Sequence, residues 1–222
     1  MTSVGLPSAH NGGGLIILAP AARVKYADPF ERVGAVVLRA ELLGSDDTLY
    51  IRAKTVRLPP REVMYSPEEL ARKYLEQFAR LPRKPLRAVV RIDSSGGAVA
   101  TAIGAAYALH DLECPVTLLI DGECASSAMY LLAYSKAQHV YITAGGRLML
   151  HNPAALSYTA QDEEKTAAHQ EQLISDQARA LAKLTGQSES QIRAWKDAET
   201  WFSAEQAVEY GFCEKIVDVS FE

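Results

Sequence analysis

Three short segments carry residue types that could act together on a carbonyl carbon. In 122–128 (GECASSA), small residues flank Ser126, so a substrate backbone could approach a hydroxyl near a helix start, where negative charge is favoured. In 93–98 (DSSGGA), the glycine pair permits a sharp turn whose N–H groups can bind a developing oxyanion. In 149–153 (MLHNP), His151 ends an apolar run. Each segment alone also fits a structural role, with Ser126 as a helix N-cap.

Other candidate nucleophiles and bases fit less well. Cys124 lies two residues before Ser126, but a cysteine in an apolar turn usually serves packing. The remaining histidines fall in the N-terminal segment, on predicted helices or at a strand start: His10, His110, His169 and His139. The three cysteines and five histidines show no metal-ligand spacing, so we expect reduced thiols, no metal and no cofactor.

Predicted strands and helices alternate along most of the chain, which indicates an α/β fold with a largely parallel sheet. Ser66, Pro67 and Glu69 form a helix-start signature, and Ser188 with Gln191 and Ser203 with Gln206 form two more capping boxes. The predicted strands are 15–19, 34–40, 49–53, 86–92, 115–121, 139–143, 147–151 and 214–218. The other predicted helices are 98–112, 125–135 and 160–184.

Composition indicates an ordinary globular protein. Of 222 residues, 48% are hydrophobic and 23% charged. The net charge of -4, without a dense Lys/Arg block, predicts no nucleic-acid partner. The apolar run 15–22 is too short to span a membrane and lacks the basic flank of a signal peptide, so we expect a cytoplasmic protein without membrane contact. Residues 1–14, rich in Gly, Ser and Pro, predict a flexible arm.

The order and spacing of five motifs resemble the Clp protease proteolytic subunit and the Clp-like head-maturation proteases of tailed phages. The matching segments are SSGG at 94–97, GECAS at 122–126, MLHNP at 149–153, TGQS at 185–188 and AVEYG at 207–211. The resemblance covers 86–218 and, more weakly, 49–85. It implies a crotonase-like (Clp protease-like) ββα spiral, with one catalytic domain over 15–222 and its core over 49–218.

The resemblance also implies the chemistry: a serine endopeptidase that hydrolyses unfolded or flexible polypeptides through an acyl-enzyme. Ser126 matches the nucleophile, and His151 matches the general base. The backbone N–H groups of Gly97 and Ser127 match the oxyanion hole.

The third member of the triad departs from the family pattern. The family has an Asp four residues before the Ser that opens the last helix, and counting back from Ser203 reaches Glu199. A Glu can also orient an imidazole. Asp197, two residues earlier, is the alternative acid, and a third reading leaves both as solvated charges.

Two more departures concern assembly. Ser95 stands where the family usually has Pro, and ALSYTAQDEEKT after Pro153 has no Gly, whereas self-compartmentalising members carry there a Gly-rich strand that pairs two rings. We therefore expect a homo-oligomeric ring without predicting a double ring. The first 48 residues match poorly, so an ATPase unfoldase is only a candidate partner. The segments HNP and ETWFSAEQA resemble the phage branch more, which makes capsid proteins another candidate.

Three alternative functions remain open at this point. A Glu in the acid position would also fit a catalytically degenerate, structural ring subunit. Crotonase-type acyl-CoA enzymes share the fold and use Gly-rich oxyanion turns, but they need no paired Ser126 and His151. Signal peptide peptidase A relatives use a Ser–Lys pair, for which Lys136 is the nearest lysine in sequence.

Overall fold

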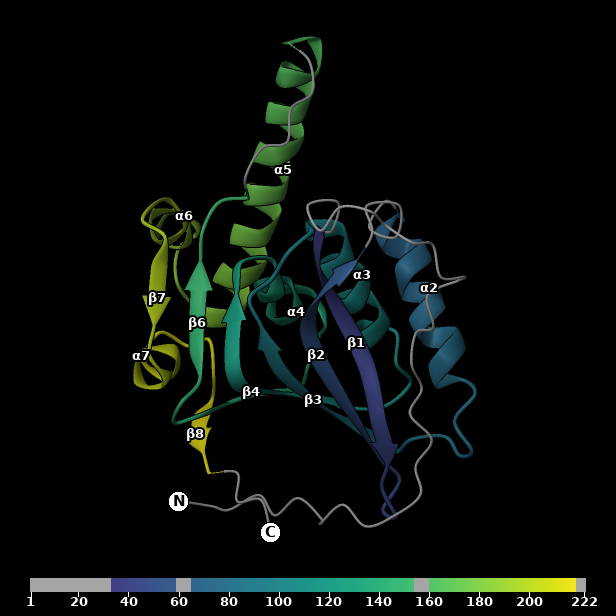
Figure 1. The fold of residues 1–222 in the computed structure, drawn as a ribbon. Helices are drawn as coiled ribbons and strands as arrows, with labels where there is room; N and C mark the ends of the chain where they lie inside the picture. The colour runs from purple at the N-terminus through teal and green to yellow at the C-terminus, as the bar shows by residue number, and fades with distance from the viewer. Residues whose placement is uncertain (1–32, 59–64, 154–159, 219–222) are drawn as a thin grey trace.

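A computed structural model describes residues 33–58, 65–153 and 160–218 (Figure 1). The predictions for 1–14 and 15–19 lie outside these residues. Within them, one eight-stranded mixed sheet has the order β1-β2-β3-β4-β5-β8, and β6 pairs with β4 and with β7. The strands are β1 (Val33–Leu43), β2 (Thr48–Leu58), β3 (Arg87–Ser94), β4 (Val116–Ala125), β5 (His139–Thr143), β6 (Arg147–Leu150), β7 (Thr200–Phe202) and β8 (Lys215–Val217).

The predicted, largely parallel sheet is confirmed. Parallel pairs join β2 to β3, β3 to β4, β4 to both β5 and β6, and β5 to β8, whereas β1–β2 and β6–β7 are antiparallel. The central strands β3 and β4 coincide with apolar runs in the sequence. On them, Val90, Ile92, Leu118 and Ile120 are fully buried. Such continuous apolar runs are typical of strands covered on both faces.

The helices follow local signals in the sequence. Ser66 caps α2 through a complete capping box with Glu69, and Tyr74 and Phe78, four residues apart on one face of the helix, are buried in the core. The Ala-rich α3 is apolar all round and accordingly buried between its neighbours. The helices are α2 (Pro67–Phe78), α3 (Val99–His110), α4 (Met129–Tyr134), α5 (Ala160–Thr185), α6 (Glu189–Asp197) and α7 (Ala204–Glu209).

Some boundaries differ from the prediction, and two of them matter for the site. Strand β4 continues to Ala125 and is followed by a short 3₁₀ turn, η2 (Ser126–Ala128), before α4 starts. β6 ends at Leu150, so His151 directly follows it. The three-residue β7 was not predicted, because an element this short shows no alternation.

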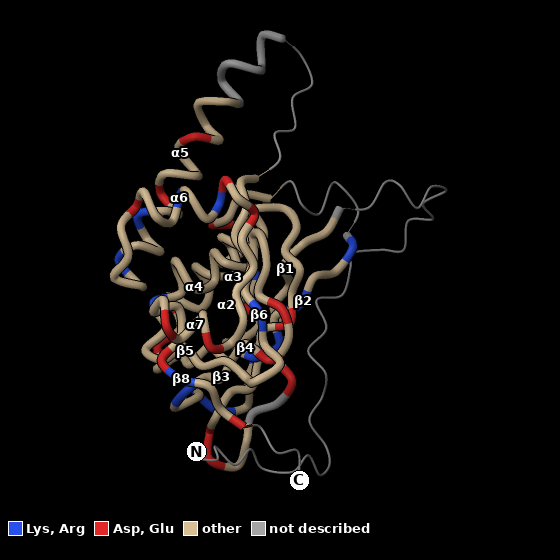
Figure 2. Tube along the Cα trace, turned by 90° about the vertical axis from the view of Figure 1, so that its left-hand side faces the viewer, with Lys and Arg blue, Asp and Glu red and all other residues tan. Residues whose placement is uncertain are grey.

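The two capping boxes predicted near the C-terminus differ in the structure. Ser203 and Gln206 make both capping-box bonds, whereas Ser188 and Gln191 make one of the two, from the Gln191 N–H to the Ser188 hydroxyl. Basic and acidic residues are interspersed along the described chain rather than gathered by sign (Figure 2). No helix in the described ranges is long and apolar enough to cross a membrane.

Candidate active site

Parallel pairing of β4 with β6 brings Ser126 and His151 together. Cys124 lies opposite Leu148 and Ala125 opposite Met149, so both strands end at the same edge. The first residues beyond that edge carry the hydroxyl and the imidazole. The Oγ of Ser126 is 2.6 Å from the Nε2 of His151, a hydrogen bond across 25 positions of sequence. This is the geometry in which an imidazole can accept a hydroxyl proton.

The backbone at Ser126 turns sharply where the strand becomes η2. Its φ of 57° lies in the left-handed region, which residues other than glycine rarely adopt. Such local strain persists where the surrounding structure holds it, often at functional turns. Ser127 and Ala125 beside it are buried, while Ser126 is partly accessible. The turn therefore presents the hydroxyl of Ser126, and not its neighbours, to a ligand.

Cys124 is not a competing nucleophile. Its side chain is fully buried, and burial raises the pKa of the thiol far above its ordinary value, with a smaller contribution from Cys213. A thiol must lose its proton to react, so Cys124 serves packing, as the sequence indicated.

The glycine pair fits tightly between the nucleophile turn and β1. Gly96 has φ 91° and Gly97 φ 139°. A Cβ added to Gly96 would lie 2.8 Å from the Cβ of Ser126, and one on Gly97 would lie 2.3 Å from the carbonyl oxygen of Gly34. Both contacts are too close for any side chain, so both glycines are required by space as well as by backbone conformation.

Thr55 on β2 holds the same turn, and the sequence analysis missed it. Its Oγ1 donates to the carbonyl of Gly96 at 2.7 Å and lies 2.9 Å from the Oγ of Ser94, which accepts from the Gly96 N–H at 3.3 Å. Thr55 is about forty positions away in sequence, so no local signal marks it. Ser95, where the family usually has Pro, is exposed, and its Oγ donates to the Oγ1 of Thr55 at 3.4 Å, so it joins this network.

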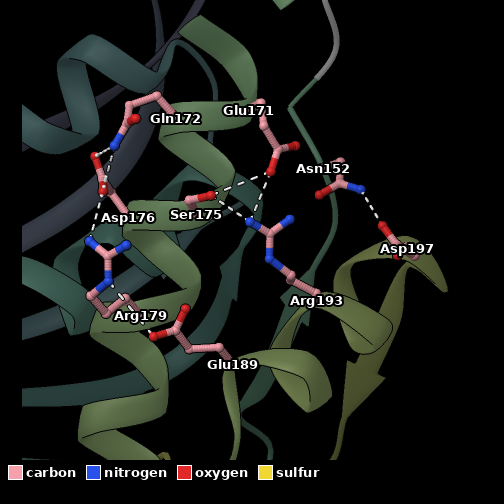
Figure 3. A network of polar contacts seen from close by, with 9 residues as sticks. All are labelled: Asn152, Glu171, Gln172, Ser175, Asp176, Arg179, Glu189, Arg193 and Asp197. Atoms are coloured by element: carbon pink, nitrogen blue, oxygen red, sulfur yellow. Dashed lines mark hydrogen bonds and ion pairs between the residues drawn. The ribbon is translucent and has the colours of Figure 1, made fainter. Parts of the chain in front are cut away.

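Antiparallel pairing of β7 with β6 sets the positions of the two candidate acids. Leu150 lies opposite Thr200, the last pair of this register, and His151 and Glu199 are the residues that adjoin that pair in the sequence. Glu199 is exposed, with φ 49°. Asp197 instead accepts a hydrogen bond from the Nδ2 of Asn152 at 2.7 Å (Figure 3). Among the described residues, no hydrogen bond joins either carboxylate to His151.

Polar contacts between α5 and α6 hold the segment that leads to these acids. Arg193 of α6 contacts Glu171 and Ser175 of α5 (Figure 3). Arg179 of α5 contacts Glu189 of α6 as well as Asp176 of its own helix.

The last turn of α6 carries a buried cation. The side chain of Lys196 is 1% exposed, and its Nζ donates to the Oε1 of Gln177 at 2.6 Å. Burial lowers the pKa of Lys196 to about 8, helped by the positive charge of Arg193. Lys196 thus fixes the end of α6, just before Asp197, against α5.

The fold and the hydrogen-bonded serine–histidine pair define the class as a serine hydrolase on an α/β scaffold. The model of the Clp protease family matches residues 65–220, and the chain belongs to that family. It is therefore a serine-type endopeptidase, and the predicted crotonase-like, Clp protease-like fold is confirmed.

Named relatives agree with this assignment. The ATP-dependent Clp protease proteolytic subunit 2 of Rhodococcus jostii (strain RHA1) is 31% identical over 153 residues, which cover 68% of this chain and 78% of the relative. Subunit 1 of Streptomyces avermitilis is 33% identical over 128 residues, covering 57% and 59%. The solved structure of a ClpP1 point mutant from Listeria monocytogenes matches with a TM-score of 0.59 at 24% identity, over 68% of this chain and 85% of that one, which speaks for the fold.

Proposed function

We propose that this endopeptidase cleaves unfolded or flexible polypeptides through an acyl-enzyme on Ser126. The observation that carries the proposal is the 2.6 Å hydrogen bond between Ser126 Oγ and His151 Nε2. The Oγ attacks the scissile carbonyl carbon while its proton moves to Nε2. The imidazolium then gives this proton to the leaving amine as the C–N bond breaks. Water, deprotonated by the same imidazole, hydrolyses the ester and restores Ser126.

The N–H groups of Gly97 and Ser127 are proposed to bind the oxyanion of the tetrahedral intermediate. Gly97 is exposed at the turn, and the N–H of Ser127 lies in the first turn of η2, where N–H groups have no acceptor within the helix. Gly96 lets the two segments approach each other closely, because it has no side chain. A Cβ added to it would lie only 2.9 Å from the Ser127 nitrogen. Each such donor typically lowers the barrier by roughly 3–4 kcal/mol.

Glu199 is proposed as the carboxylate that orients His151. The antiparallel register supports it, since Glu199 directly precedes Thr200 and His151 directly follows Leu150, the two residues that form the last pair of β6 and β7. Asp197 is the alternative, but the Asn152 amide already uses one of its oxygens. In the proposed reaction Glu199 would accept from the Nδ1–H of His151 and stabilise the imidazolium.

We further propose a homo-oligomeric ring built from one catalytic domain over 15–222 and located in the cytoplasm. The similar proteins from Rhodococcus and Streptomyces are named ATP-dependent proteolytic subunits, which supports an ATPase unfoldase as the partner to test first. Capsid proteins are the second candidate partner.

Active-site labelling tests the proposal directly. Wild type, Ser126→Ala, His151→Ala and the control Ser45→Ala, an exposed serine of the β1–β2 turn, are treated with a fluorophosphonate and analysed by intact mass and peptide mapping. We expect one adduct on Ser126 in wild type and in Ser45→Ala, and none in the other two. A folded wild type that stays unlabelled would instead favour the structural ring subunit, and labelling that persists in Ser126→Ala would refute the nucleophile.

A further inference from the structure

The Gly97 N–H differs from the backbone donors on either side of it. The Gly96 N–H donates to the Oγ of Ser94 at 3.3 Å, and the Ala98 N–H donates to the carbonyl oxygen of Gly34 at 2.7 Å. The Gly97 N–H makes no hydrogen bond to the described residues. Of these three donors, only the middle one is therefore left for a ligand.

The covalent chain does not fix the direction in which this N–H points. A Cβ restricts the rotation of the peptide units beside it, but the unit between Gly96 and Gly97 has no Cβ on either side. Because the C=O and N–H of a trans peptide unit point in opposite directions, a half-turn of this unit would put a carbonyl oxygen in place of the N–H. That oxygen would repel an oxyanion instead of binding it.

The hydroxyl of Thr55 holds the carbonyl end of the same peptide unit. Its Oγ1 donates to the Gly96 oxygen at 2.7 Å. A hydroxyl has one proton, so in the 2.9 Å contact between Thr55 Oγ1 and Ser94 Oγ the donor is Ser94. Ser94 in turn accepts from the Gly96 N–H. These three bonds form a closed ring that holds both the N–H and the C=O of Gly96, and hydrogen bonds in such chains strengthen one another.

The sheet fixes the Thr55 side chain. Thr55 lies opposite Val36 in the β1–β2 pair, and its Cγ2 is 3.5 Å from the place where a Cβ on Gly34 would stand. A β-branched side chain is stiff at χ1, so packing of the methyl group also sets the direction of the hydroxyl. Thr55 is half-buried and Ser94 is 2% exposed, so water competes little for these bonds.

We propose that Thr55 is a positioning residue for the reaction at Ser126. By binding the Gly96 oxygen, its hydroxyl keeps the Gly97 N–H directed at the developing oxyanion. The inference rests on the proposed function, because it takes Ser126 as the nucleophile and Gly97 as an oxyanion donor. In this role Thr55 does not touch the substrate, so its loss should act on the transition state and leave substrate binding unchanged.

The test compares wild type, Thr55→Val, Thr55→Ser and Thr117→Val on one fluorogenic peptide that wild type cleaves, with kcat and KM determined separately. Valine replaces the hydroxyl by a methyl group of similar size, whereas serine keeps the hydroxyl. Thr117 is the matched control, because it is a half-buried threonine at the start of β4, the opposite end of that strand from Ser126. Thr55→Ala removes the same hydroxyl without adding a methyl group, and it takes the place of Thr55→Val if circular dichroism shows that the valine variant does not fold.

The expected effect is a loss of kcat at constant KM. Removing an oxyanion donor lowers kcat about 10²- to 10³-fold. Thr55→Val leaves the Gly97 N–H in place and only frees its direction, so kcat should fall about 10- to 100-fold, with KM within about twofold of wild type. Thr55→Ser should retain most of kcat, and Thr117→Val should match wild type.

A peptide boronate gives a second readout that a merely structural role would not move. Its tetrahedral adduct on Ser126 puts an oxygen where the oxyanion forms. Thr55→Val should therefore weaken binding of the boronate by the same factor as it lowers kcat/KM.

Fluorophosphonate labelling separates the possible failures. If wild type forms the Ser126 adduct but Thr55→Val keeps the wild-type kcat, the positioning role is refuted while the proposed function stands. A loss in Thr55→Ser as large as in Thr55→Val would also refute it, because the hydroxyl would then not be the group that matters. A raised KM with unchanged kcat would refute it by assigning Thr55 to substrate binding. If wild type forms no adduct, the proposed function fails, and the positioning role fails with it.

Discussion

The two halves of the candidate site rest on different kinds of structure. Ser126 and His151 follow β4 and β6. Near the ends of these strands, Cys124, Leu148 and Leu150 are each 1% exposed or less. Glu199 precedes β7, a three-residue strand that pairs only with β6 in the described sheet. Its other support comes from α6. Polar contacts join α6 to α5, among them Arg193–Glu171 (Figure 3). Aromatic rings also cluster around Trp195 of α6.

The difference indicates which part of the site is rigid. Buried apolar strands interlock closely, so the positions of Ser126 and His151 are determined by the core. Exposed ion pairs such as Arg193–Glu171 contribute only about 0–1 kcal/mol each, so they hold the acid segment less firmly. We expect changes in the first half to cost more activity than changes in the second.

Gly96→Ala tests the tightly packed half and should have the largest effect. The new Cβ would lie 2.7 Å from the carbonyl oxygen of Ala125 and 2.8 Å from the Cβ of Ser126, at a φ of 91°. Displacing the nucleophile and an oxyanion donor together should lower kcat/KM about 10³-fold. Peptide hydrolysis measures this, with circular dichroism to verify the fold. Gly145→Ala, where an added Cβ meets nothing within 4 Å, is the control, and equal activities of the two variants would contradict the comparison.

Glu199→Gln, compared with Asp197→Asn, tests the loosely held half. Neutralising a buried triad carboxylate lowers kcat about 10⁴-fold. Because Glu199 is exposed and water can partly replace it, we expect a loss of about 10²-fold, with less than about fivefold for Asp197→Asn. Steady-state kcat values decide between them. A larger loss for Asp197→Asn would reverse the assignment, and no loss for either would leave His151 without a functional acid.

Lys196→Met tests the buried lysine that holds the end of α6 against α5, just before Asp197. We expect it to have the smallest effect of these variants, on the free energy of unfolding rather than on activity. The folded chain holds Lys196 with a pKa of about 8, lowered by burial, whereas an unfolded lysine titrates near 10.4. Between these values only the unfolded chain keeps the proton, so this lysine makes the free energy of unfolding rise with pH. From pH 7 to 10 its contribution should rise by about 2 kcal/mol.

Urea denaturation of wild type, Lys196→Met and Lys183→Met at pH 7, 8, 9 and 10 measures this contribution. The difference between wild type and Lys196→Met isolates it from other groups that titrate in alkali. Lys183, exposed on α5, controls for the loss of a charge. A constant difference across the pH series would show that folding does not lower the pKa of Lys196.

Much of the fold was predictable because its signals are local. The capping box of Ser66 and Glu69 depends on residues three positions apart, and it begins α2 as expected. Apolar runs predicted the central strands for the same reason. The hydroxyl and the imidazole were also predictable as candidates, since Ser126 and His151 lie in short motifs with recognisable order.

What only the tertiary structure decided depends on contacts between residues far apart in the chain. The hydroxyl of Thr55 meets the carbonyl of Gly96 across 41 positions, and Asn152 meets Asp197 across 45. The short β7 has no periodicity to predict it, yet its register pairs Trp201 with Met149 and Thr200 with Leu150, the residue before His151. A sequence specifies which residues are present and how neighbouring ones fold, whereas the pairing of strands decides which of them meet, because that pairing is set by burial of the whole sheet.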